Sequence, residues 1–253
     1  MPAADILSGY FPRFLLILLR SSVFLAFLPI LGAKTLPARF RIGLAVAIAA
    51  VLTPVVEFRA AENDAAILVL REIVLGMVLG LAVRFVFFGV EIAGQMISDA
   101  MGMSIATVFN PEIGQSTEIA RLLGVLATLL FLVTDAHHDL IALFVRSYDL
   151  VPAGGADVRV LIGEGIALVG RVFLIAVKLG APVVVGMVTL NLLLGFVYKA
   201  TPQVNIFFIS FPIYISVGFL ILLLALPAYI VAIGGSFAEI RTEMAHVIGM
   251  ARR

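Results

Sequence analysis

The sequence predicts an all-α membrane protein, and two observations support that prediction. Hydrophobic residues make up 62% of the 253 residues and charged residues only 13%, whereas a soluble domain has about 25% charged residues. Several apolar runs also reach or approach the roughly 20 residues that a helix needs to cross the ~30 Å hydrocarbon core of a bilayer. With a mean hydropathy of +1.18, we expect long kinked helices and helical hairpins in contact with lipid.

Composition also excludes several classes of function. The chain has no cysteine, which rules out disulfides, thiolate metal centres and thiol nucleophiles. The net charge of +1 provides no basic field for nucleic acid. No nucleophile-elbow, P-loop or zinc-protease motif is present. We therefore expect neither enzyme activity nor a cofactor, and we interpret the apolar start as a retained helix and not a removed signal.

Six apolar runs set the order of the chain. The first four are predicted at 14–32, 42–58, 73–93 and 119–133. The third contains Gly76 and Gly80, a small-xxx-small pair that permits close helix contact. The fifth, 162–198, is nearly unbroken, with a kink expected at Pro182, and at ~1.5 Å per residue it would extend well beyond the hydrocarbon thickness. The sixth, 206–233, leads into a tail that is predicted to be an amphipathic helix, as is a shorter piece at 140–148.

Charged residues inside these runs need partners. Glu164, Arg171 and Lys178 are spaced seven apart and form one stripe on a helix. A charge at mid-bilayer costs at least about 2.5–3.5 kcal/mol, so the stripe should face protein or water; the alternative is an interfacial position with Lys178 extended toward water. Arg84 and Glu91 are two turns apart, too far for a direct helical pair. We expect both to meet partners on other helices or subunits.

The distribution of basic residues gives conflicting topologies. Lys34, Arg39 and Arg41 would place the first connection inside, and the arginines of the tail would place the C-terminus inside as well. Six spans cannot satisfy both. Either one run does not cross the membrane, or other subunits hold the chain in its final geometry.

The stretch 91–118, between the third and fourth runs, is too polar for lipid and too apolar for a free loop. Its apolar residues include two methionines, which can fill an irregular space, and hydrophobic constrictions can exclude water. Its glycines allow turns and motion. The stretch is therefore predicted to line or close something inside an assembly, and the alternative is an interfacial loop with no gating role. The apolar residues are Met101, Met103, Ile105, Val108 and Phe109, and the glycines are Gly94, Gly102 and Gly114.

Three separated motifs resemble a known family. They are GQMISDAMGMSIATVFNPE at 94–112, LLFLVTDAHHDLI at 129–141 and NLLLGFVYKATPQVNIFFISFPI at 191–213. In this order, and over nearly the whole chain, they resemble the FliR export-gate family of type III secretion, which serves flagella and injectisomes. The family usually has aspartate before the proline where this chain has Asn110 before Pro111, and often an aromatic residue where it has Ile105.

The resemblance implies a non-enzymatic, single-copy subunit of the gate that forms and closes the channel for unfolded export substrates. Its location would be the bacterial inner membrane, at a flagellar basal body or an injectisome base. Its partners would be FliP-like and FliQ-like membrane subunits, a FlhB-like subunit and membrane lipid. Residues 1–152 would be a FliP-like part and residues 153–253 a FliQ-like hairpin. A loop at about 102–118 would be the plug, with the gate formed by Met101, Met103, Ile105, Val108, Phe109, Asn110 and Pro111.

Two polar motifs have simpler interpretations. Residues 135–139, Asp-Ala-His-His-Asp, have metal-binding side chains, but adjacent histidines on a regular helix point about 100° apart. We therefore expect a polar cap at a helix boundary and no metal. The second motif is typical of a hairpin turn whose amides could bond to other subunits, and it consists of Thr201, Pro202, Gln203 and Asn205.

Two other functions compete with an export gate. A small secondary transporter would need related halves and a polar site at broken helices, and no convincing internal repeat is visible in the hydropathy. The second is a membrane assembly scaffold without a pore. The motifs do not separate the flagellar branch from the injectisome branch, because both share them. The transporter site would use Arg84, Glu91, Arg171, Lys178 and Asn191.

Overall fold

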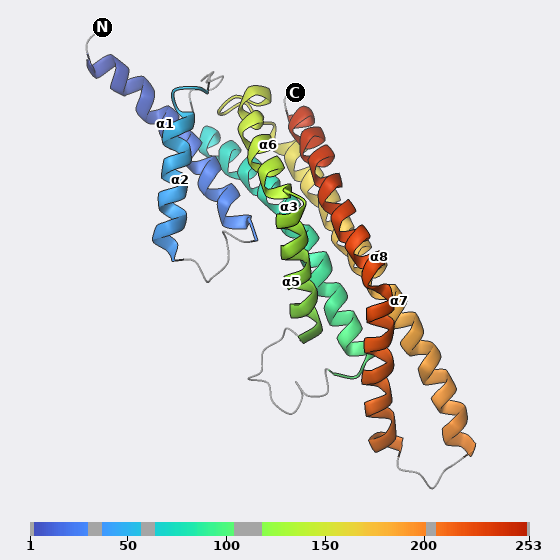
Figure 1. Cartoon of the computed structure of the whole chain (residues 1–253). Helices are drawn as coiled ribbons and strands as arrows, with labels where there is room; N and C mark the ends of the chain where they lie inside the picture. Colours follow the sequence, from blue (N-terminus) through green and yellow to red (C-terminus); the bar gives the residue numbers. More distant parts are fainter. Residues whose placement is uncertain (1–2, 30–36, 57–63, 104–117, 201–205, 252–253) are drawn as a thin grey trace. The chain divides into compact units, whose positions relative to one another are not determined.

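Every regular element in the computed structural model is an α-helix within the residues that the structure describes, which are 3–29, 37–56, 64–103, 118–200 and 206–251. The all-α prediction is therefore confirmed. In chain order (Figure 1) the helices are α1 (Ala3–Phe27), α2 (Ala38–Leu52), α3 (Ala65–Ala100), α5 (Glu118–Val133), α6 (Ala136–Leu150), α7 (Val158–Ala200) and α8 (Ile206–Ala251).

Three of these helices are much longer than a bilayer requires. α3 has 36 residues, α7 has 43 and α8 has 46, and at ~1.5 Å per residue each exceeds the ~30 Å hydrocarbon core. Four of the described helices are long and apolar enough to span a membrane, or five if α5 and α6 together form one bent span. At 15 residues, α2 is shorter than the core. This agrees with the alternative in which one apolar run does not cross.

Several predicted boundaries differ from the observed ones. α1 begins at Ala3, well before the predicted 14–32, because Pro12 lies inside the helix without ending it. α3 extends the predicted 73–93 at both ends and takes in the first ten residues of the stretch 91–118. The tail predicted after 206–233 is continuous with α8. In each case the prediction placed a boundary where the composition becomes more polar, but the helix continues past that point.

The described chain divides into two compact units. The first comprises residues 1–85, 135–170 and 237–253, and the second comprises residues 86–134 and 171–236. Both units are therefore assembled from separate stretches of sequence, and α3, α7 and α8 contribute residues to each. The predicted division into parts 1–152 and 153–253 follows a different logic, that of family resemblance, and stays a prediction.

In the first unit, α1 packs closely on α3 because two glycines remove the side chains between them. A Cβ at Gly76 would lie 2.8 Å from the Arg20 carbonyl oxygen, and one at Gly80 would lie 2.7 Å from Phe27 Cβ. These separations are shorter than any ordinary contact, so only glycine fits. The close contact predicted from the small-xxx-small pair is confirmed. α6 joins the same core, where the Phe24 and Phe144 rings stack at 4.5 Å.

In the second unit, glycines again allow close helix contacts. A Cβ at Gly89 on α3 would lie 2.8 Å from Ile175 on α7, and one at Gly186 on α7 would overlap Ile221 on α8. Much of the apolar surface of α7 is left exposed. Phe173 is 71% exposed and Phe196 is 74% exposed. In the isolated chain this face of α7 is available to lipid or to other subunits.

Candidate functional site

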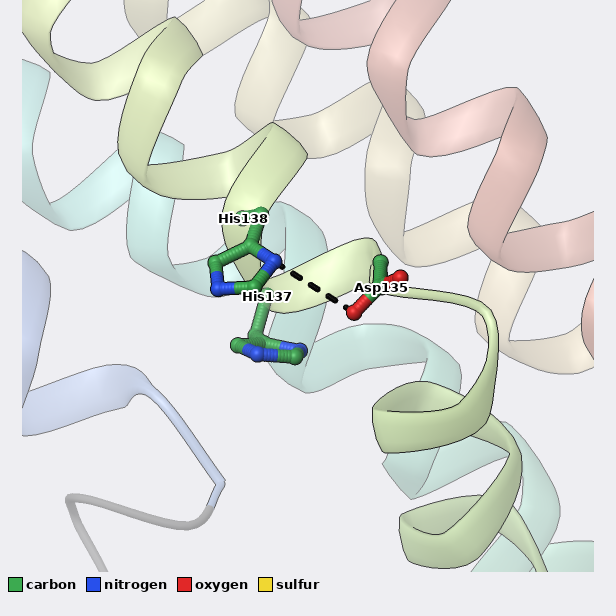
Figure 2. Close-up of side chains that lie close together, drawn as sticks. All are labelled: Asp135, His137 and His138. Carbon is green, nitrogen blue, oxygen red and sulfur yellow. Dashed lines mark ion pairs between the residues drawn. The ribbon is translucent and has the colours of Figure 1, made fainter.

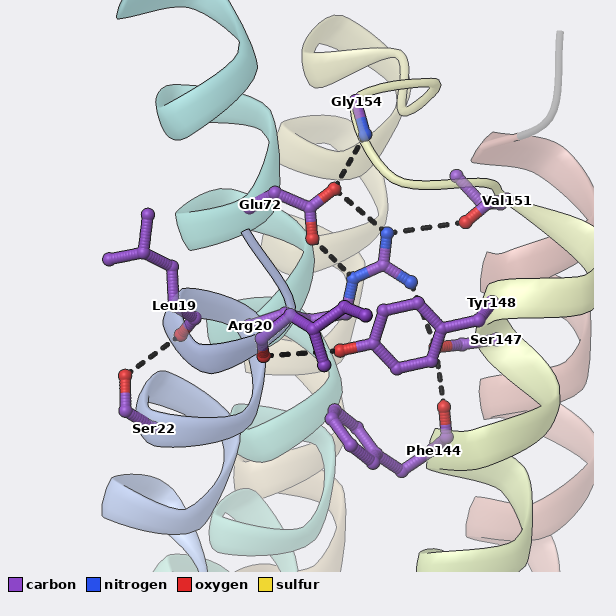
Figure 3. A network of polar contacts seen from close by, with 10 residues as sticks. Leu19, Arg20, Ser22, Glu72, Phe144, Ser147, Tyr148, Val151 and Gly154 are labelled. Carbon is purple, nitrogen blue, oxygen red and sulfur yellow. Dashed lines mark hydrogen bonds and ion pairs between the residues drawn. The ribbon is translucent and has the colours of Figure 1, made fainter. Parts of the chain in front are cut away.

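A charged pair lies completely buried in the first unit (Figure 3). The Arg20 guanidinium on α1 donates from Nε to Glu72 Oε2 at 2.7 Å and from Nη2 to Glu72 Oε1 at 2.9 Å. Both side chains have zero exposure. This two-bond geometry is the strongest that arginine and a carboxylate form, and it fixes α1 against α3 in both position and orientation.

The remaining hydrogen-bonding groups of this pair reach α6 and the segment after it. Arg20 also donates to Ser147 Oγ and to the Val151 carbonyl oxygen, each at 3.2 Å, and the Gly154 amide donates to Glu72 Oε1 at 2.7 Å. The guanidinium carbon lies 4.0 Å from the centre of the Tyr148 ring, within the range of a cation–π contact. We call this set of residues, Arg20, Glu72, Ser147, Tyr148, Val151 and Gly154, the polar hub.

Substitutions in the polar hub should lower the free energy of unfolding strongly, because both charged side chains are fully buried and water cannot solvate a charge that loses its partner. Breaking a buried pair by removing one partner typically costs about 3–5 kcal/mol, since the other charge stays buried and uncompensated. Gly154 has a positive φ of 82°, a conformation that glycine adopts without strain. Arg71 Nη1 donates to its carbonyl oxygen at 2.9 Å. The left-handed backbone at Gly154 is therefore held by hydrogen bonds to two charged side chains, Glu72 and Arg71.

The other feature of interest is the end of α3, where the predicted gate stretch begins. Gly102 has a φ of 73°, and its amide donates to Asp99 O while the Met103 amide donates to Ser98 O, both at 3.0 Å. These two bonds form a Schellman motif, the usual way in which a glycine ends a helix. Gly102 therefore forms a turn that sets the direction in which the chain leaves α3, and its predicted role as a hinge stays a prediction.

Tight contacts within the second unit hold this end of α3. Met101 is completely buried, and a Cβ at Gly218 on α8 would lie 2.5 Å from Met101 Cγ. A Cβ at Gly94 would overlap Ala120 on α5. The C-terminal part of α3 therefore packs against small residues on two other helices, Ala120 on α5 and Gly218 on α8. We call these residues, Gly94, Met101, Gly102, Ala120 and Gly218, the gate anchor.

Two residues of the gate anchor, Met101 and Gly94, were predicted to act in the gate. The Met101 side chain is fully buried within this chain, where it holds the end of α3 against α8, and its part in the gate stays a prediction. Gly94 was expected to act as a hinge, and it is observed inside a helix at a close contact with α5. Met103 is only half-buried and keeps apolar surface for a neighbour. Hinge motion at Gly94 stays a prediction.

Most of the remaining predicted gate and turn residues lie outside the described residues. In the gate stretch these are Ile105, Val108, Phe109, Asn110, Pro111 and Gly114. In the predicted hairpin turn these are Thr201, Pro202, Gln203 and Asn205. Their roles stay predictions.

The predicted stripe of charges on α7 has mixed surroundings. Glu164 is half-buried, with its Oε2 4.0 Å from His246 Nδ1, whereas Arg171 and Lys178 are exposed in the isolated chain. On α3, Arg84 is half-buried and Glu91 is exposed. Contacts of these residues with other subunits stay predictions.

The side chains of Asp135, His137 and His138 lie closer together than the sequence predicted. Asp135, the residue before α6, has φ 53° and ψ 21°, so the backbone turns sharply before His137 and His138. One ligand atom from each of these three residues lies within 4.8 Å of the others. Consecutive histidines do converge here, although their divergence on a regular helix argued against it.

Sequence reasoning missed the main partners in the polar hub. Arg20 interrupts the first apolar run and Glu72 lies just before the third, but no local pattern pairs two residues that are 52 positions apart. The sequence did contain a signal for this pair. Arg20 and Glu72 are opposite charges within or beside apolar runs, and an unpaired charge in such a run is energetically costly, which favours pairing.

The chain is similar to a known family of bacterial membrane proteins along most of its length. A family model described as bacterial export proteins, family 1, matches residues 11–240. The chain is 29% identical over 251 residues to the flagellar biosynthetic protein FliR of Bacillus subtilis (strain 168), covering 95% of this chain and 96% of that protein. It is 31% identical over 240 residues to the FliR protein of Escherichia coli (strain K12), covering 91% and 90%. A third FliR protein, from Caulobacter vibrioides, is 31% identical over 206 residues.

Long apolar helices and this family match together define the class: the chain is a membrane-embedded bacterial export protein. Within that class, the extent of the similarity is decisive, because it covers at least nine-tenths of both chains in two relatives. The chain belongs to the FliR family of flagellar biosynthetic proteins.

Proposed function

We propose that the chain is a subunit of the gate in a flagellar type III protein export apparatus. The observation that carries this proposal is similarity to FliR proteins along almost the full length of both chains. The relatives named above all bear a flagellar name, which favours the flagellar branch over the injectisome branch. Nothing in the described helices favours a transporter or a scaffold specifically.

The proposed partners are FliP-like and FliQ-like membrane subunits, with a FlhB-like subunit in the same hetero-oligomer at the inner membrane. Two features of the chain support such neighbours. Helices α3, α7 and α8 are longer than a bilayer needs, and α7 exposes large apolar side chains such as Phe173 and Phe196. A FliP-like part at 1–152 and a FliQ-like hairpin at 153–253 would distribute these contacts.

The proposed gate element is the stretch from Gly102 to residue 118, which leaves α3 through the Schellman turn. Met101, fully buried against Gly218, would hold the base of this stretch. Beyond it, Ile105, Val108 and Phe109 supply apolar side chains that would exclude water from a narrow pore. Opening would then require these side chains to leave the pore while the gate anchor stays in place.

The function is tested by export of flagellin from a strain that lacks the chain. We expect no flagellin in the culture medium, and restored export when the wild-type chain is supplied on a plasmid. Normal export without the chain would contradict the proposal. Swimming through soft agar gives an independent measure of the same outcome.

The gate role is tested by removing the apolar side chains of the stretch. We expect deletion of residues 105–109 to raise the leak of ions across the inner membrane above background. A matched variant replaces the same five positions with glycine and serine, which keeps the loop length and removes the apolar side chains. Leak in both variants supports a hydrophobic seal, whereas background leak in both would refute it.

A further inference from the structure

The cluster at the start of α6 has the donors of a metal site (Figure 2). His138 Nδ1 lies 3.3 Å from Asp135 Oδ1. The rings of His137 and His138 are tilted by 38°, with their centres 4.0 Å apart. One nitrogen from each ring and one carboxylate oxygen lie within 4.8 Å of one another. Three side chains of metal-ligating type, from four consecutive residues, therefore lie close together.

The backbone conformation of Asp135 bears on where its carboxylate lies relative to the two histidines. Among the described residues, Asp135 is the one non-glycine residue with a positive φ, 53°. A left-handed residue at the start of α6 turns the chain sharply, so the Asp135 carboxylate lies beside the His138 ring. Aspartate and asparagine tolerate this conformation better than most residues. Non-glycine residues in this conformation are uncommon, and they concentrate at sites where the geometry serves a function.

We propose that Asp135, His137 and His138 bind one divalent transition-metal ion, with Zn²⁺ as the reference ligand. Three points no more than 4.8 Å apart fit within a circle of radius about 2.8 Å (4.8 Å divided by √3). Zinc bonds to histidine nitrogen and carboxylate oxygen are about 2.0–2.2 Å long. To bind one ion, the donor atoms would move inward by less than about 1 Å, and the two imidazole rings, which are tilted by 38°, would rotate until their nitrogen lone pairs meet at the ion. Two imidazoles and one carboxylate are a recognised zinc donor set, and a remaining position stays open for water or a further ligand.

The surroundings permit a cation at this point. A helix N-terminus carries partial positive charge and by itself disfavours a cation. Two carboxylates oppose that effect, because Asp135 precedes α6 and Asp139 lies in its first turn. Arg241 on α8 offsets one of them only loosely, with Nη1 3.9 Å from Asp139 Oδ2. The Asp135 and His138 side chains are 73% and 72% exposed, so an ion can enter from water.

The chain offers a clean test because it contains three histidines. Two are in the cluster. The third, His246, is also exposed and lies 4.0 Å from a carboxylate, that of Glu164, which makes it a matched control. The full-length chain is purified in detergent with an affinity tag that contains no histidine, stripped with EDTA, and titrated with Zn²⁺ against a fluorescent zinc chelator. Titration with Co²⁺ reports the ligand geometry through its visible absorption.

We expect one tightly bound Zn²⁺ per chain. Asp135→Asn, His137→Asn and His138→Asn should each weaken binding at least about tenfold, since even outer-shell changes commonly cost 10–100-fold. Asp135→Asn keeps a residue that tolerates the left-handed backbone, and circular dichroism checks that each variant retains its helices. His246→Asn should bind within about twofold of the wild type. Equal affinity in the cluster variants and the wild type, an equal loss in His246→Asn, or no stoichiometric binding would each overturn the proposal.

Discussion

The polar hub and the gate anchor fix helices against one another by different chemistry. In the hub, the fully buried Arg20 guanidinium donates two hydrogen bonds to the buried Glu72 carboxylate, and further bonds reach α6 and the segment after it. In the anchor, Met101 lies over Gly218, and Gly94 lies against Ala120. Charge-assisted hydrogen bonds demand one geometry, whereas apolar contacts over small residues are non-directional. The hub therefore fixes its helices through directed hydrogen bonds, whereas the anchor fixes the end of α3 through close fit at small residues.

The largest expected effect is that of removing Glu72. Glu72→Ala leaves the Arg20 guanidinium buried with no counter-charge, which typically costs about 3–5 kcal/mol. We expect a corresponding fall in the free energy of unfolding, measured by denaturant titration in detergent. Glu91→Ala is the matched control, because Glu91 lies exposed on the same helix and its loss should change stability by less than about 0.5 kcal/mol.

A double substitution separates the charge pair from the general packing of the hub. Arg20→Met with Glu72→Leu removes both charges and retains apolar volume, and such replacements of buried pairs are often neutral or stabilising. We expect the double variant to be more stable than Glu72→Ala by about 2 kcal/mol or more. A double variant that is no more stable than Glu72→Ala would show that the cost does not come from an isolated charge.

The second effect tests the gate anchor. Gly94→Leu places a side chain where the backbone of Ala120 lies, and overpacking of this kind costs about 1–3 kcal/mol. Gly124→Ala on α5 is the control, because a Cβ there meets nothing within 4 Å. It should stabilise the chain by up to about 1 kcal/mol, since alanine is the better helix former. Both are measured by denaturant titration. A tolerated leucine at 94 would mean that the contact between α3 and α5 can open freely.

A smaller effect is expected at the end of α3. Gly102→Ala forces a Cβ onto a residue with φ 73°, which costs about 1–2 kcal/mol. Because the strain is local, the amides of Gly102 and Met103 should exchange with deuterium faster while the rest of α3 is unchanged. Gly163→Ala on α7 is a suitable control, because a Cβ there also meets nothing within 4 Å. Unchanged exchange at residues 102 and 103 would argue against a strained cap.

The smallest change in stability is expected for substitutions of Tyr148 in the polar hub. Tyr148→Phe removes a hydroxyl whose hydrogen bond to the Ile17 carbonyl oxygen is long, at 3.4 Å, and keeps the ring that lies against Arg20. We expect a loss of less than about 1 kcal/mol in unfolding free energy. Tyr148→Leu also removes the ring and should cost at least about 1 kcal/mol more, because the cation–π contact with Arg20 and the edge contact with the Phe144 ring are both lost. Equal stabilities of the two variants would assign no energy to these ring contacts.

Sequence patterns predict some of these features and not others, for physical reasons. Apolar composition over many residues is a local property, so α5 and most of α7 were predicted close to their observed bounds. Gly76 and Gly80 were predicted to permit close contact because their spacing on a helix is also local. The Arg20–Glu72 pair joins residues 52 positions apart, and no local pattern says which charges meet. The sharp turn at Asp135 depends on one backbone dihedral, which composition does not encode.

If this chain works as one part of a multi-subunit export gate, its partners should remain bound to it during purification, and native mass spectrometry of the complex would show them. The chain is tagged in its own organism and purified from membranes in mild detergent. We predict a hetero-oligomer that contains one copy of this 27.0 kDa chain with several copies of small FliP-like and FliQ-like membrane proteins. A stable monomer, or a complex without those proteins, would contradict the account.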